Sequence, residues 1–98
     1  MPTYATLISF TAQELSSIGD PKKAYGDVIE TSAQMGIKII GAYATLGPHD
    51  LMLVYEAADE KAAASVAMGF GTKWYGRSET WTLIPMGEFI KLAAKLKD

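Results

Sequence analysis

The sequence predicts an α+β domain in which helices cover one face of a four-stranded antiparallel sheet. Three observations lead to this prediction. Strand-like and helix-like periodicities follow one another in the order β-α-β-β-α-β, glycine and proline punctuate the boundaries, and a last amphipathic segment comes after the fourth strand. This order is the split βαβ, or ferredoxin-like, plan with an added C-terminal helix.

The chain has 98 residues, which is room for one domain over 1–98. Hydrophobic residues make up 49% and charged residues 20%, as in globular domains and unlike disordered chains. A domain of this size can bury a core without help from metals or disulfides.

The first strand and the first two helices follow from local signals. Residues 3–10 are β-rich and alternate loosely, which predicts a strand. Residues 11–14 carry the S/T-x-x-E pattern of a capping box, which predicts a short helix to about residue 18. Asp20 suits the N-cap and Pro21 the first position of a longer helix, which Gly36 should end.

The second half of the chain begins with a predicted hairpin. Residues 37–46 and 50–56 read as strands on either side of a Gly-Pro turn. Asp59 can cap the helix that follows, and Gly69 and Gly71 should close it.

A fourth strand and a last helix complete the pattern. Residues 73–83 are rich in Trp, Tyr and Thr, which predicts a strand. Pro85 suits the start of a helix. The stripe that we expect to point inward from this helix consists of Met86, Phe89, Ile90, Ala93 and Leu96.

The predicted strands are apolar on both faces, although a sheet face in water should be polar. In the second strand, for example, one set consists of Ile37, Ile39 and Tyr43, and the opposite set of Ile40, Ala42 and Leu46. A monomer would expose a large apolar patch, which soluble monomers avoid. We therefore expect a second copy to cover this face in a twofold homodimer.

Several segments resemble, in the right order, those of the GYD domain family of small bacterial and archaeal proteins. They are residues 20–24 (DPKKA), 41–47 (GAYATLG), 56–60 (EAADE) and 77–80 (RSET). The stretch that corresponds to the family's Gly-Tyr-Asp signature reads Gly-Pro-His-Asp over 47–50, so His49 stands where tyrosine is frequent. The resemblance implies a ferredoxin-like fold of the dimeric α+β barrel kind. Barrels of this shape include small monooxygenases, haem-handling enzymes, isomerases and ligand-sensing domains, so the fold does not fix the function.

The composition excludes several classes of function. A net charge of −2 disfavours nucleic-acid binding, which normally shows a basic surplus. The chain has no cysteine and one histidine, which excludes thiolate chemistry and multi-histidine metal sites within one chain. No apolar run approaches the about 18 residues of a membrane span, and no signal peptide is visible, so we expect a cytoplasmic protein.

The candidate catalytic residues are His49 and Asp50, in the predicted hairpin turn. The imidazole could serve as a general acid or base, or as an axial haem ligand. The alternative is that His49 is an ordinary surface residue and that Asp50 bonds the backbone of the turn.

The candidate ligand-binding residues are a charged pair and several large rings. Arg77 and Glu79 share one face of the fourth strand, where the arginine could hold a carboxylate or oxyanion, or pair with the glutamate across strands. The rings, which could line a pocket for an aromatic ligand or simply fill the core and an interface, are Tyr4, Tyr43, Tyr55, Trp74 and Trp81.

Two functions from different classes fit these residues. The first is a homo-oligomeric small-ligand-binding or sensor-like protein without catalysis. The second is a small cofactor-free monooxygenase or isomerase that acts on an apolar or aromatic substrate, with His49 or Asp50 handling the proton. A purely structural partner protein that assembles through its edge strands is a third.

Overall fold

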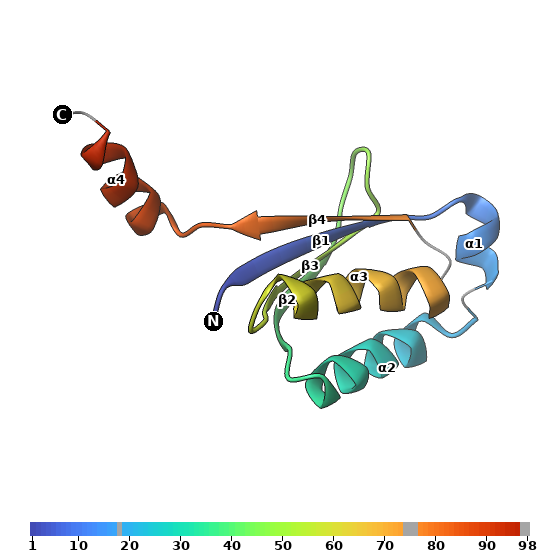
Figure 1. Ribbon diagram of the computed structural model, residues 1–98. Coiled ribbons are helices and arrows are strands. Elements are labelled where there is room, and N and C mark those ends of the chain that lie inside the picture. The colour runs from blue at the N-terminus through green and yellow to red at the C-terminus, as the bar shows by residue number, and fades with distance from the viewer. Residues whose placement is uncertain (18, 74–76, 97–98) are drawn as a thin grey trace.

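The computed structural model describes residues 1–17, 19–73 and 77–96. Its elements, shown in Figure 1, are β1 (Thr3–Ser9), α1 (Ala12–Ser17), α2 (Pro21–Gln34), β2 (Lys38–Ala44), β3 (Leu51–Glu56), α3 (Glu60–Lys73), β4 (Arg77–Leu83) and α4 (Met86–Lys95). The order agrees with the βαββαβ pattern and the C-terminal helix predicted from the sequence.

The four strands form one antiparallel sheet in the order β2-β3-β1-β4. Helices α2 and α3 lie side by side on one face, and the loop between β2 and β3 rises on the opposite side (Figure 1). The sheet therefore has one helix-covered face and one open face, and both β2 and β4 are edge strands. This arrangement confirms the predicted α+β class.

The core lies between the sheet and α3. The buried side chains that form it are Tyr4, Ile8, Ile37, Leu53, Tyr55, Ala57, Ala63 and Val66. The ring of Tyr55 is fully buried, and its hydroxyl bonds Thr6 Oγ1 at 2.7 Å and approaches the carbonyl of Ala63 at 3.5 Å. Thr6 Oγ1 also bonds Thr80 Oγ1 at 3.0 Å, so a short polar chain crosses the helix-side face of three strands.

The predicted helix starts are confirmed in atomic detail. The carboxylate of Asp20 accepts hydrogen bonds from the N–H groups of Lys22 and Lys23, which caps α2. Thr11 and Glu14 form the reciprocal capping box, with bonds of 2.8 and 3.1 Å between side chain and backbone.

The boundary between the third helix and the fourth strand differs from the prediction. Gly69 and Gly71 do not end the helix, because α3 continues to Lys73. The strand begins at Arg77 and not at residue 73, and positions 74–76 lie outside the described residues. A glycine inside a helix costs only about 1 kcal/mol relative to alanine, which packing of the same helix on a sheet can offset.

A β-bulge in β2 changes which residues share a face. Ile39 lies opposite Tyr55, whereas Gly41 lies opposite Val54 and Tyr43 opposite Met52. Ile39 therefore packs on the core, and Tyr43 lies on the open face. The prediction that Ile39 and Tyr43 share a face is wrong, because the bulge adds one residue and reverses the alternation.

The ring of Tyr43 packs against Gly41. A Cβ at position 41 would lie 2.7 Å from the Tyr43 hydroxyl oxygen, so the tyrosine ring occupies the space of the missing side chain. The small residue lets the ring fold back over the edge strand.

The open face is apolar at its centre, as the sequence predicts. Cross-strand partners place together on it Ala5, Leu7, Tyr43, Met52, Val54, Trp81 and Leu83. Tyr43 and Trp81 are each about half exposed in the single chain.

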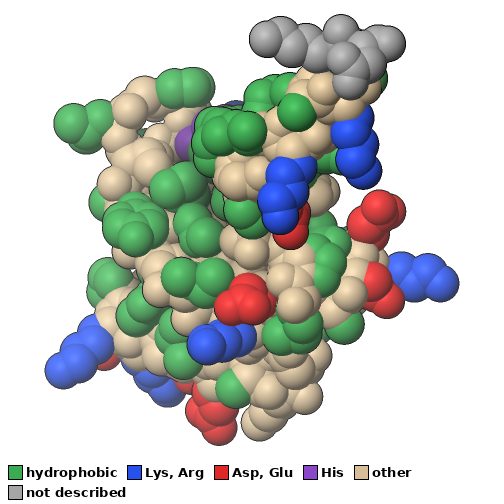
Figure 2. All heavy atoms as spheres, turned by 90° about the vertical axis from the view of Figure 1, so that its left-hand side faces the viewer, with side chains coloured by type: hydrophobic (Ala, Val, Ile, Leu, Met, Phe, Trp, Pro, Cys, Tyr) green, Lys and Arg blue, Asp and Glu red, His purple; other side chains and the backbone are tan. Residues whose placement is uncertain are grey.

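Helix α4 stands away from the rest of the chain (Figure 1). None of its residues is buried, so the prediction that its apolar stripe points inward is wrong for the single chain. In Figure 2 this helix leads to the grey C-terminal residues, with hydrophobic side chains along one side of it and basic side chains along another. The cause is the straight connection after β4, which contains Ile84 and Pro85.

Candidate functional site

The structure divides the predicted site residues between the two faces of the sheet. Tyr4 and Tyr55 lie in the core on the helix side, with ring centroids 6.0 Å apart. The residues on the open face are Tyr43, Arg77, Glu79 and Trp81. Trp74 lies outside the described residues. These residues therefore do not surround one shared cavity.

A polar cluster at the end of β1 brings together His49 and Glu79, which the sequence analysis treated separately. His49 Nε2 lies 3.3 Å from Glu79 Oε2, and Nδ1 lies 2.9 Å from Ser9 Oγ. The three residues come from the β2–β3 loop, β4 and β1. Ser9 was missed by sequence reasoning, because a single serine at a strand end carries no pattern of its own.

The loop that carries His49 is held in place by its neighbours. Thr45 Oγ1 donates a 2.6 Å hydrogen bond to the carbonyl of His49. Asp50 Oδ2 accepts a 2.7 Å hydrogen bond from the Phe10 N–H. Asp50 thus bonds the backbone, which is the alternative to a catalytic role. This bond fixes the loop against the end of β1.

The cluster resembles a serine–histidine–carboxylate triad in composition. The Ser9 hydroxyl has one proton, which it can donate to the carbonyl of Pro48 at 3.3 Å or to His49 Nδ1 at 2.9 Å, so the tautomer of the imidazole sets the direction of the Ser9–His49 bond. In a nucleophilic triad the serine donates its proton to the imidazole. A haem ligand would need an open ring nitrogen, and in this geometry Ser9 and Glu79 engage both.

A metal ion has no ligand set in the part of the chain that the structure describes, because no group of three His, Asp or Glu side chains converges there. The same residues include no helix that is both long and apolar enough to cross a membrane.

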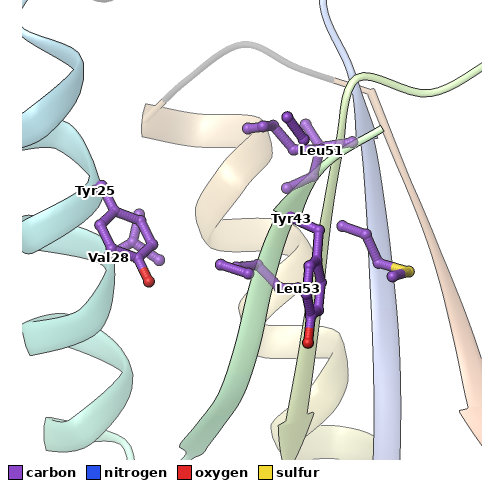
Figure 3. A pocket seen from close by; sticks show the side chains of 9 residues that line it. Tyr25, Val28, Tyr43, Leu51 and Leu53 are labelled. Carbon is purple, nitrogen blue, oxygen red and sulfur yellow. The ribbon is translucent and has the colours of Figure 1, made fainter. Parts of the chain in front are cut away.

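The first cavity lies between α2 and the middle of the sheet and holds about 350 Å³. Figure 3 shows Tyr25 and Val28 of α2 turned toward the strands, with Leu51 and Leu53 facing them. The other residues on its border are Ile8, Ala42, Tyr43, Ala44 and Met52. Its wall is apolar except for the hydroxyl of Tyr25 and the backbone, because the ring of Tyr43 lies on the open face of the sheet.

A second hollow of about 490 Å³ lies on the other side of α2, along edge strand β2. Tyr25 borders both hollows. The remaining lining residues are Ile29, Ala33, Gly36, Ile37, Lys38, Ile39, Ile40 and Gly41. We call this hollow the α2–β2 groove.

A third hollow of about 370 Å³, next to the start of α3, includes Tyr4. None of the three hollows has a residue of the His49 cluster, Asp50 or Arg77 on its wall. The candidate acid–base groups therefore lie apart from these three hollows.

The model of the GYD domain family matches residues 4–93. This chain belongs to the GYD domain family. The assignment confirms the resemblance found in the sequence. Within this GYD domain, the signature position held by His49 lies on the open side of the sheet, bonded to Ser9 and Glu79.

One relative of this GYD domain is described by its function. A glutamine synthetase and cystathionine beta-lyase binding protein of Thermus thermophilus is 26% identical over 98 residues, which span 99% of this chain and 100% of the relative.

Two solved structures share the fold. The leucine response regulatory protein of Mycobacterium tuberculosis gives a TM-score of 0.54 at 12% identity, over 85% of this chain and 50% of that one. FFRP-DM1 gives a TM-score of 0.52 at 18% identity, over 86% of this chain and 100% of that one. These likenesses confirm the predicted fold, and the GYD domain spans half the length of the mycobacterial regulator.

Proposed function

We propose that this GYD domain is a homo-oligomeric, sensor-like binding protein that takes a small apolar or aromatic ligand between α2 and the sheet. The observation that carries the proposal is the 350 Å³ apolar cavity. This volume lies within the range of about 300–1,000 Å³ that ligand sites occupy. The hydroxyl of Tyr25 at its border can exchange a hydrogen bond with a ligand, which would set the ligand's orientation.

The lining of the cavity supports binding over catalysis. Its wall has no carboxylate, imidazole, ammonium or guanidinium group, so it offers no strong acid or base to a bound molecule. The monooxygenase or isomerase alternative needs His49 or Asp50 beside the substrate. Both belong to the loop on the other side of the sheet.

The open face supports self-association. Its apolar centre, with Tyr43 and Trp81 half exposed, is the kind of surface that soluble proteins cover. A second copy packed on it by a twofold axis buries the same residues of both chains. The Thermus relative, by its name, binds two enzymes, which supports a binding role for the family member described here.

The test begins with a native mass spectrum of the protein as purified from cells. We expect a dimer that carries a fixed additional mass, removable under denaturing conditions. Val28→Trp should remove the adduct, because the indole fills the cavity that Val28 borders, while the protein stays dimeric.

Lys23→Gln is the matched control, since Lys23 is exposed on the same helix and lines none of the three hollows. An adduct that survives Val28→Trp, or that Lys23→Gln removes equally, would contradict the proposed location. An unliganded protein that binds no member of a panel of apolar and aromatic compounds would contradict the proposed function itself.

A further inference from the structure

Helix α4 carries a hydrophobic surface that its own chain leaves open. Six large apolar side chains between residues 84 and 96 are at least half exposed: Ile84, Met86, Phe89, Ile90, Leu92 and Leu96. The charged residues Glu88, Lys91 and Lys95 lie on the opposite side of the helix. A helix of ten residues is marginal in water by itself, since isolated helices need about 12–15 residues. Helix α4 therefore needs a surface to pack on.

That surface does not belong to the same chain. Two residues, Ile84 and Pro85, separate β4 from α4. Pro85 is extended, with φ −54° and ψ 140°, and a residue before proline is held in extended conformations too. The chain therefore leaves β4 in a straight line, and a return over its own sheet would need a turn that this dipeptide disfavours.

We infer that α4 of one copy docks into the α2–β2 groove of a second copy. The inference rests on the self-association proposed above, but not on the proposed ligand. A twofold axis that runs parallel to the strands between two open faces places β4 of one copy beside β2 of the other, because β2 and β4 are opposite edges of the sheet. Helix α4, which continues from β4, then reaches the partner's β2 edge and the groove beside it.

The groove suits the apolar face of an amphipathic helix in polarity. It holds about 490 Å³, and its wall is mainly apolar, with Ile29, Ile37 and Ile40 among the lining residues. Ile40 is 53% exposed in the single chain, so the groove leaves a large side chain for the helix to cover. This is the recognition mode in which an apolar helix face enters a hydrophobic groove.

The charged residue on the groove wall is Lys38. Helix α4 carries the acidic Glu88 in its first turn. A pair between these two groups would add little energy, but it would favour one direction of the helix in the groove.

A standard interface buries about 800 Å² per partner. The six exposed apolar side chains at and before α4 contribute to this area together with the open face, and the twofold axis doubles both contributions.

The test is an engineered disulfide between two copies. The chain has no cysteine of its own, so no native thiol competes with the introduced ones. One preparation carries Ile90→Cys on α4, and a second carries Ala33→Cys in the groove. After mixing and mild oxidation, we expect a covalent species of two chains that contains one of each. The matched control pairs Ile90→Cys with Gln13→Cys, an exposed position on α1, and should give at least tenfold less product.

A second variant separates docking from folding. Phe89→Asp should weaken dimerisation at least tenfold by sedimentation while the circular dichroism spectrum of the body stays unchanged, because the residue contacts no core. Gly87→Ala, a change with no neighbour within 4 Å, should leave the dimer intact.

Three results would overturn the inference: equal cross-linking at Gln13, a disulfide within a single chain carrying both Ile90→Cys and Ala33→Cys, or unchanged dimerisation of Phe89→Asp. A dimer that persists in any of these cases would leave the proposed packing of the open faces standing. A protein that sediments as a monomer would overturn both.

Discussion

Tyr55 shows how a single residue connects the core to the pH dependence of stability. Burial raises the pKa of the Tyr55 hydroxyl above the value of 10.0 for an exposed tyrosine, and the hydrogen bonds with Thr6 and Thr80 lower it part of the way back. The folded state therefore holds this proton more tightly than the unfolded state does.

The stability contributed by this proton is fully present below the pKa of the unfolded tyrosine. Above it, the unfolded state ionises first, so the free energy of unfolding should fall as pH rises toward the folded-state pKa. We expect urea unfolding between about pH 8 and about pH 11 to show this loss in the wild type, and Tyr55→Phe to show a smaller one.

Tyr43→Phe is the control for Tyr55→Phe, because the Tyr43 ring is half exposed and the alkaline loss should persist in that variant. An equal loss in wild type and Tyr55→Phe would show that another group causes it.

For single residues, the sequence shows which side chains could matter better than it predicts which residues they contact. The sequence shows that Tyr and Trp are abundant. Whether one of these rings fills the core depends on contacts with residues that are distant in the sequence. Thr6 and Tyr55 are 49 positions apart, and Ser9 and His49 are 40 apart. Such contacts follow from the register of the sheet, which local periodicity does not give.

Of the two helices that cover the sheet, α2 depends more on its own cap than α3 does. It is packed along β2 and leaves a hollow on each side, so packing supports it less than it supports α3. Asp20 binds two of the N–H groups at its start that lack a partner within the helix.

Asp20→Ala should lower the free energy of unfolding by about 1 kcal/mol, since both capping bonds are lost. Urea unfolding measures the loss, and amide hydrogen exchange should show it concentrated in α2. Asp27→Ala, an exposed change in the middle of the same helix, should cost less. A larger cost for Asp27→Ala would mean that the cap is not what holds the helix.

The elements that were predicted well are those with chemical signals at their ends. The capping box at Thr11 and the Asp20–Pro21 start were confirmed to the residue. Glycine was the weaker signal, because Gly69 lies inside α3 although glycine often ends helices. The bulge in β2 has no composition signal of its own beyond Gly41.

At the scale of the whole molecule, the proposed self-association through the open face can be tested by a single substitution. Trp81→Lys should weaken dimerisation by about 2 kcal/mol, or about thirtyfold, because it places a charge in the apolar centre of the proposed interface. Sedimentation across a concentration series measures this change.

Ala64→Lys adds the same charge to an exposed position of α3 and should leave the dimer unchanged. Equal dissociation constants for Trp81→Lys and wild type would place the interface elsewhere.

The open face was predictable from sequence because strand alternation without a polar set is a local pattern. The position of α4 away from the rest of the chain was not predictable, since it depends on the extended conformation of the connection through Ile84 and Pro85.

Tyr25 borders both the cavity under α2 and the groove beside it, so one ring belongs to both of the proposed binding surfaces. Thermodynamic linkage then follows: if a molecule in the cavity changes the affinity of the groove for the partner's helix, the partner's helix changes the affinity of the cavity by the same factor. A rotation of one half-exposed side chain would be enough to couple them. In such a protein the fraction of assembled chains would itself report the ligand concentration, without a separate signalling domain.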